Sequence, residues 1–277
     1  MDNAWWKVPA VRAGVLASVV VACGPDGGSA GTGRVQVFLE GEASISEGVA
    51  AGTGDEDLID GWAVTYDKFL VAVGNYRAWR NAQPGDVREV PTVQVVDMLA
   101  LPQGGAVVAE WDGMAAVQWD KFSYDIPNAN AQSVRHPLTD EADLNRMVTH
   151  GWSLYIEATL RKGTVTHRIN GWGLSAGTRY ADCAPESGDS GFAVTAGGTV
   201  QVKPTIHGDH WFFTNITQGA ELTQRRAQWI VDSDVNGDGV TTLEELRATP
   251  AADVFPSGMY NLSGAGMTIL TAFDYLE

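Results

Sequence analysis

The sequence is poor in cysteine, in basic residues and in long apolar runs. It has two cysteines in 277 residues, so at most one disulfide can form within the chain. No stretch approaches the roughly 20 consecutive apolar residues that a membrane-spanning helix needs. Lys and Arg number 18 against 34 Asp and Glu, giving a formal net charge of -16. This balance disfavours nucleic acid and anionic lipid surfaces as partners.

What the chain does contain is enough apolar material for a core. Hydrophobic residues make up 44% of it, which excludes a wholly disordered chain. The 32 glycines and 11 prolines indicate many turns. The length allows one large domain or two modest ones.

The N-terminus has the features of an export signal. Lys7 and Arg12 precede the apolar run from Ala13 to Ala22, which is too short to cross a bilayer. The run ends in Val20-Val21-Ala22-Cys23 and is followed by a glycine-rich stretch to residue 33. This resembles the bacterial lipoprotein signal, which implies cleavage before Cys23, a lipid on Cys23 that anchors the protein to a membrane, and a location in the bacterial cell envelope. An ordinary cleaved signal with an incidental cysteine is the alternative.

The body of the chain is rich in alternating, β-forming segments separated by turn residues. The predicted strands are residues 34–40, 62–73, 90–101, 106–111, 117–126, 152–160, 165–174 and 200–206. Because no long crossover helices separate them, antiparallel pairing is expected. A short helix is predicted over Asp140–Val148, with Thr139 as its cap.

The predicted fold class is therefore mainly β: an antiparallel β-sandwich-like body followed by a helical segment. The expected organisation is a signal peptide over residues 1–23, a tether and first strand over 24–57, a β-rich domain over 58–215, and a helical segment over 216–277.

One twelve-residue stretch, Asp234 to Glu245, has oxygen-bearing side chains at regular spacing. It fits the pattern D-x-[DN]-x-[DN]-G-x5-E at every specified position. Calcium takes about 6–8 oxygen ligands, so a short loop must turn oxygens inward from alternate residues. The predicted calcium ligands are Asp234, Asn236, Asp238, the backbone carbonyl of Val240, Thr242 (directly or through water) and both oxygens of Glu245.

The flanks of this stretch predict helices, an entering one over residues 220–231 and an exiting one over 243–247. Residues 220–249 thus resemble the EF-hand family, and the resemblance implies calcium binding. The family usually has Ile, Val or Leu at position 8 of the loop, where this sequence has Thr241, and no second loop is evident. A lone hand is expected. The alternative is an acidic, glycine-rich turn that holds no metal.

A second candidate site is the segment Ile206-His207-Gly208-Asp209-His210. Two imidazoles three residues apart at a strand end can share a copper or zinc ion, and Asp209 can ligate or orient one of them. His150 and His167 are candidates for approaching the same end of a sheet. Ordinary polar or buried roles are the alternative, and for His167, on the face of Val165 and Ile169, a core role is favoured.

Gly188-Asp189-Ser190-Gly191 resembles the nucleophile segment of serine proteases. Phe192 stands where that family has another glycine, and no Ala-Ala-His-Cys segment supplies a base. Ser190 as the nucleophile of a hydrolase is therefore the least favoured interpretation.

Together these observations predict a lipid-anchored, exported, non-catalytic calcium-binding protein, in which calcium has a structural or regulatory role. A copper- or zinc-binding lipoprotein that uses the histidine pair is the main alternative. The sequence identifies no protein or carbohydrate partner.

Overall fold

The computed structural model describes residues 31–183, 191–217, 220, 223–263 and 268–276. The signal-like segment with Cys23 and the Ser190 segment lie outside these residues. No helix within the described ranges is long and apolar enough to cross a bilayer.

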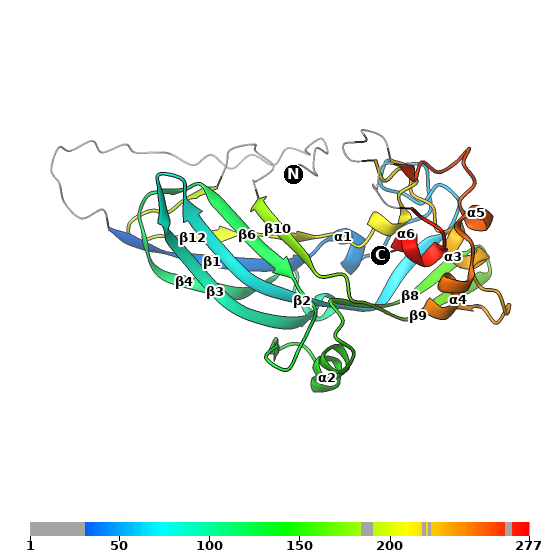
Figure 1. Ribbon diagram of the computed structural model, residues 1–277, viewed down its shortest axis with the longest axis horizontal. Helices are drawn as coiled ribbons and strands as arrows, with labels where there is room; N and C mark the ends of the chain where they lie inside the picture. The colour runs from blue at the N-terminus through cyan, green and yellow to red at the C-terminus, as the bar shows by residue number, and fades with distance from the viewer. Residues whose placement is uncertain (1–30, 184–190, 218–219, 221–222, 264–267, 277) are drawn as a thin grey trace.

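The protein is mainly β, with multistranded, curled sheets (Figure 1). The strands are β1 Thr32–Gly41, β2 Ala63–Arg80, β3 Gln83–Asp97, β4 Ala106–Ala115, β5 Gln118–Trp119, β6 Lys121–Ile126, β7 Val134–Arg135, β8 Leu154–Lys162, β9 Val165–Leu174, β10 Thr178–Cys183, β11 Phe192–Ala193, β12 Thr199–Val202, β13 Thr205–Ile206 and β14 Val240–Thr241. The helices are α1 Ala43–Ser46, α2 Glu141–His150, α3 Gln228–Asp232, α4 Leu243–Ala248, α5 Ala251–Val254 and α6 Ala272–Leu276, with 3-10 turns η1 Met98–Ala100 and η2 His210–Phe212.

The long strand β2 organises the larger sheet, whose strand order is β10-β6-β2-β8-β9-β14, with β3 also paired to β2. Register shifts interrupt the pairing of β2 along its 18 residues. Its register against β8 shifts between Tyr66 and Lys68, and its register against β3 shifts between Gly74 and Tyr76, where Asn75 has a φ of 51°. Because bulges increase local twist, β2 curves along its length.

The smaller sheet is built on β1, which pairs with β4 on one side and with β12 and β13 on the other. The pairings of β1 with β12 and β13, β3 with β7, and β9 with β14 are parallel. The expectation of antiparallel pairing is therefore wrong for these four contacts, in which the short strands β7, β12, β13 and β14 pair with strands that are distant in the sequence.

Alternation along the strands creates the core. Val35, Val37 and Leu39 of β1 are fully buried and belong to the same apolar cluster as Val71 and Val73 of β2. The middle of β2 is buried on both faces, since Leu70 and Ala72 enter a second cluster beneath α2. In Figure 1, α2 lies on the opposite side of the sheet from α6.

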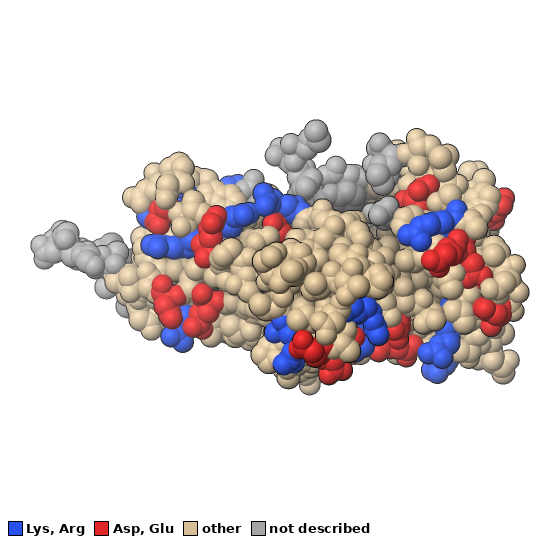
Figure 2. Space-filling model, turned by 60° about the horizontal axis from the view of Figure 1, so that its bottom comes forward, with Lys and Arg blue, Asp and Glu red and all other residues tan. Residues whose placement is uncertain are grey.

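The remaining helices, α3 to α6, gather at the end of the sheet formed by β8 and β9 (Figure 1). Trp229 of α3 packs against Trp172 of β9, with ring centroids 6.0 Å apart, and both side chains are fully buried. Phe255 and Tyr275 extend this aromatic cluster. In Figure 2, acidic and basic side chains lie at both ends of the molecule and along the lower edge of this face, around an uncharged area at its centre.

Two local predictions are wrong. A tether and first strand are expected over residues 24–57, but helix α1 also lies in this range. Thr139 does not cap α2: its hydroxyl accepts a hydrogen bond from the Asp97 amide at 2.8 Å, and Asp140 stands at the N-cap position. Thr139 serves the contact between α2 and β3 instead of the helix itself.

Candidate functional site

The Asp234–Glu245 loop connects α3 to α4 and lies against the edge of the larger sheet. Its β14 residues pair in parallel with β9, Val240 opposite Arg168 and Thr241 opposite Ile169. The Arg168 amide also donates to the Gly239 carbonyl at 3.0 Å. The loop thus adds its two strand residues to the edge of the larger sheet through β9.

Acidic and amide side chains of the loop accept hydrogen bonds from backbone amides of the same loop. Asp234, with a side chain only 7% exposed, accepts from the Gly237 and Gly239 amides, both at 2.8 Å. Asn236 accepts from the Asp238 amide at 2.8 Å, and Asp238 accepts from the Val240 amide at 2.9 Å. Gly237 and Gly239 have φ angles of 73° and 84°, in the region that favours glycine.

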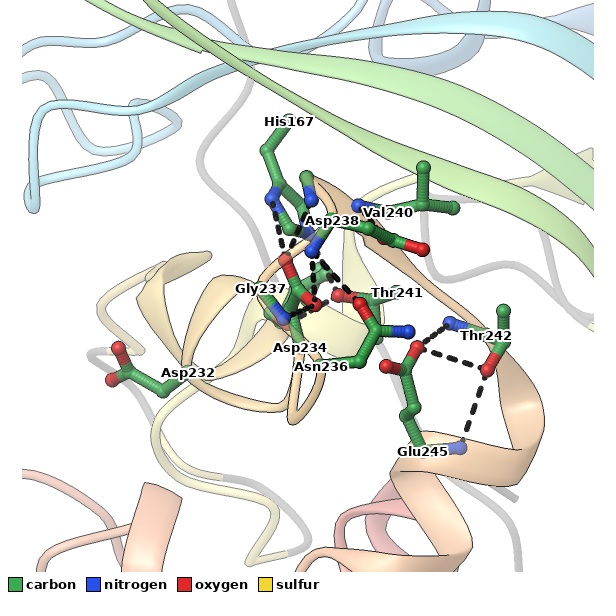
Figure 3. A network of polar contacts seen from close by, with 12 residues as sticks. His167, Asp232, Asp234, Asn236, Gly237, Asp238, Val240, Thr241, Thr242 and Glu245 are labelled. Atoms are coloured by element: carbon green, nitrogen blue, oxygen red, sulfur yellow. Dashed lines mark hydrogen bonds and ion pairs between the residues drawn. The ribbon is translucent and has the colours of Figure 1, made fainter.

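Glu245 at position 12 is buried, with one carboxylate oxygen engaged and the other not. Its Oε2 accepts from the Thr242 amide and hydroxyl, both at 2.9 Å, and Thr242 in turn caps α4 in a capping box. Its Oε1 is buried and has no hydrogen-bond partner. In Figure 3, the Glu245 side chain projects from α4 toward the loop, whereas Asp232 points away from it.

Thr241, the departure from the aliphatic residue usual at position 8, is fully buried and makes three hydrogen bonds. Its hydroxyl donates to the Ile230 carbonyl at 2.6 Å and lies 2.7 Å from His167 Nε2. Its carbonyl accepts from Trp172 Nε1 at 2.9 Å. The threonine therefore ties the loop both to α3 and to β9, which an aliphatic side chain cannot do.

His167 is buried, as its position in β9 predicted, and lies beside the loop. Its Nδ1 is 3.9 Å from Asp234 Oδ2. Burial lowers the pKa of the imidazole, and the nearby carboxylates of Asp234, Asp238 and Glu245 oppose that shift.

The entering helix is shorter than predicted, because α3 begins only at Gln228 and residues 223–227 are not helical. Asp60 Oδ2 accepts from the amides of Ala227 and Gln228, at 2.7 and 2.8 Å, and so caps the helix from a distant part of the chain. Arg225, which precedes α3, donates from Nε to Asp209 Oδ2 at 2.7 Å. The exiting helix α4 agrees with the prediction.

The donor set of this loop suits a hard cation. It presents carboxylate, amide and carbonyl oxygens, which calcium prefers, and a buried carboxylate oxygen without a partner, which is costly unless a cation satisfies it. The residues that would hold calcium are Asp234, Asn236, Asp238, Val240 through its carbonyl, Thr242 and Glu245. Because the Thr242 hydroxyl donates to Glu245, contact through water suits it better than direct ligation.

The second predicted site also assembles in part. His207, Asp209 and His210 each offer a ligand atom, and these atoms lie within 4.8 Å of one another. The two imidazole rings stack with centroids 5.0 Å apart. Burial lowers the pKa of His210 to about 4; Asp209 opposes this shift, whereas His207 and Arg225 add to it.

His150 and His167, the two candidates for approaching this pair, do not join it. His150 ends α2 and stacks on Trp152 at 4.3 Å, and His167 faces the Asp234 loop. His167 lies in β9 and the histidine pair follows β13, and these two strands belong to different sheets, so their ends do not meet at one edge.

Sequence reasoning missed three residues that shape these sites: Asp60 at the start of α3, Glu42 beside His207, and Tyr66, whose hydroxyl donates to the Gly208 carbonyl. None carries a local signal, since each acts across more than 140 residues. It also missed the pocket of about 220 Å³ that His207 and His210 line.

Comparison of the chain with models of protein families found no match, and comparisons with curated proteins and with solved structures found none either.

Proposed function

We propose that this protein binds one calcium ion in the Asp234–Glu245 loop. The role of the ion is non-catalytic: it stabilises or regulates the C-terminal helical layer. The observation that carries the proposal is the buried, unpartnered Oε1 of Glu245 at the twelfth loop position. An ionised carboxylate buried at that point is destabilising until a cation compensates its charge. Position 12 is also where EF-hand-like loops supply their bidentate ligand.

Calcium here would act on packing. The loop is continuous with α3 and α4, and β14 adds it to the sheet, so ligands drawn together by an ion would hold the helices against β9. In this proposal the two sheets form a sandwich-like body, and the EF-hand-like segment is fastened to one end of it.

The proposed setting comes from the N-terminal sequence. A lipid on Cys23 would place the domain on the bacterial cell envelope, on the exported side, with residues 24–33 as a tether. Extracellular calcium is often millimolar, so even a site with a Kd of about 0.1–1 mM would be substantially occupied there.

The test is a calorimetric calcium titration of the intact chain and two single variants. Glu245→Gln removes the charge at position 12 and is expected to weaken calcium binding by roughly tenfold or more. Glu244→Gln is the matched control: it changes the adjacent residue of α4, which is exposed, and is expected to bind calcium within about twofold of wild type. Absence of calcium uptake by the wild type, or equal loss in both variants, would overturn the proposal.

A further inference from the structure

The turn from His207 to His210 is held in place from both sides, as a built binding site is. The parallel pairing of β13 with β1, Gly41 opposite Ile206, places the turn next to Glu42 and α1. The Gly208 amide donates to Ser44 Oγ at 3.0 Å, and its carbonyl accepts from Tyr66. A Cβ at Gly208 would come within 2.8 Å of Ile45, so this close approach requires glycine.

Asp209 supplies the buried, oriented carboxylate of the site. The residue is 5% exposed, and its Oδ2 accepts from Arg225 Nε at 2.7 Å. Its Oδ1 is buried without a hydrogen-bond partner and lies 4.0 Å from His210 Nε2. A ligating carboxylate that is itself hydrogen-bonded through its second oxygen is the usual arrangement around a metal.

Glu42 is placed to orient one of the two histidines. Its Oε2 lies 2.6 Å from His207 Nδ1, within hydrogen-bond distance, so that nitrogen can donate to the carboxylate. Carboxylates that orient a ligating histidine in this way fix its tautomer and raise its basicity.

We propose that His207, Asp209 and His210 form a zinc site whose remaining coordination position faces the adjoining pocket and accepts the carboxylate of a small apolar acid. Three atoms no more than 4.8 Å apart share a point within about 2.8 Å of each, so side-chain shifts of about 0.7 Å reach ordinary zinc–ligand distances of about 2.1 Å. Three protein ligands with one open position are typical of zinc sites that take an external ligand.

The placement of the residues explains the open position and the ligand class. Both histidines line the pocket, whereas Asp209 is not part of its wall. Elsewhere the wall is mainly apolar and aromatic, and includes Phe69, Leu154, Leu174 and Trp211. A volume of about 220 Å³ is below that of drug-sized sites, so the pocket suits a small molecule with an apolar body and an anionic head.

The first experiment is a zinc titration of the intact chain by calorimetry in saturating calcium, so that the Asp234–Glu245 loop does not compete for zinc. One zinc ion is expected, with affinity falling at least about 100-fold in His207→Ala and in His210→Ala, and roughly 10-fold in Glu42→Gln. His150→Ala, which removes the exposed histidine of α2, is the matched control and should bind zinc as wild type does.

The second experiment needs no variant. Co²⁺ bound to the wild-type chain is expected to show visible d–d bands that shift when benzoate is added. Zinc uptake must persist in Glu245→Gln, which separates this site from the calcium loop. Failure of the wild type to take up zinc, or uptake unchanged in both histidine variants, overturns the site; Co²⁺ bands indifferent to benzoate overturn the open position.

Discussion

His167 Nε2 and Thr241 Oγ1 lie 2.7 Å apart in the buried seam between β9 and the Asp234–Glu245 loop. Because the Thr241 hydroxyl gives its hydrogen to the Ile230 carbonyl, His167 Nε2 is the donor of the contact. A single side chain thus joins α3, the loop and the sheet, at the position where an EF-hand usually has an aliphatic residue.

Thr241→Val should destabilise the protein by about 2 kcal/mol, because it leaves His167 Nε2 buried without a partner and removes one of the two hydrogen bonds to the Ile230 carbonyl, which keeps the Ser233 amide as a donor. Thr241→Ser keeps the hydroxyl and loses one methyl, so a loss of about 1 kcal/mol is expected. Urea unfolding in EGTA measures both without the contribution of calcium. Equal losses in the two variants would show that the hydroxyl does not matter.

Calcium removal should lower thermal stability. A ligand at 100 times its Kd stabilises the folded state by about 2.7 kcal/mol, which for a domain of this size raises Tm by about 5–10 °C. Scanning calorimetry of the intact chain in calcium and in EGTA measures the difference. The shift should be nearly lost in Glu245→Gln and kept in Glu244→Gln. A shift of the same size in Glu245→Gln would place the calcium elsewhere.

Local pattern was enough to predict several of the strands and the loop. The range predicted for one strand, residues 165–174, is that of β9, and the spacing of oxygens selected a loop that lies between two helices. Both features depend on residues close together in the chain.

Features set by distant residues could not be predicted in the same way. The start of α3 depends on Asp60, which lies 167 residues before Ala227 and accepts a hydrogen bond from its amide. This contact begins the helix at Gln228, although the residues upstream also have a helical pattern. The contact of Glu42 with His207 depends on the register of β13 on β1, and nothing near either residue indicates it.

A partly buried ion network joins α2 to the larger sheet. Lys68 of β2 lies 2.8 Å from Asp97 and 3.0 Å from Asp143, two carboxylates that are almost fully buried. Burial alone would lower the pKa of Lys68, but hydrogen bonds to the two aspartates outweigh it and raise the pKa.

Lys68→Met should therefore cost about 3 kcal/mol, because it leaves the buried carboxylate of Asp97 without a counter-charge and that of Asp143 with Arg146 alone, 3.5 Å away. Lys203→Met is the control: Lys203 pairs with Glu40 at 3.4 Å, but both side chains are exposed, so a change below about 0.5 kcal/mol is expected. Urea unfolding at pH 7 compares them. Equal effects of the two substitutions would contradict a structural role for the network.

His136 makes stability depend on pH. It is buried between β7 and α2, and its Nδ1 accepts from the Leu138 amide at 3.4 Å, which requires the neutral ring. Burial lowers its pKa below the ordinary 6.5. The unfolded chain then binds a proton that the folded protein excludes, so the stabilising contribution is complete above about pH 6.5 and is lost as the pH falls from there toward the folded pKa.

His136→Asn offers a side-chain oxygen to the same amide but does not titrate in this range. The variant should lose less stability than wild type between pH 7 and pH 5, by at most about 1.4 kcal/mol per pH unit. Because His167 and His210 also have lowered pKa values, the wild-type slope should be reduced and not abolished. Urea unfolding at several pH values in calcium measures the two slopes. Identical slopes would show that His136 takes up its proton equally in the folded and unfolded chain.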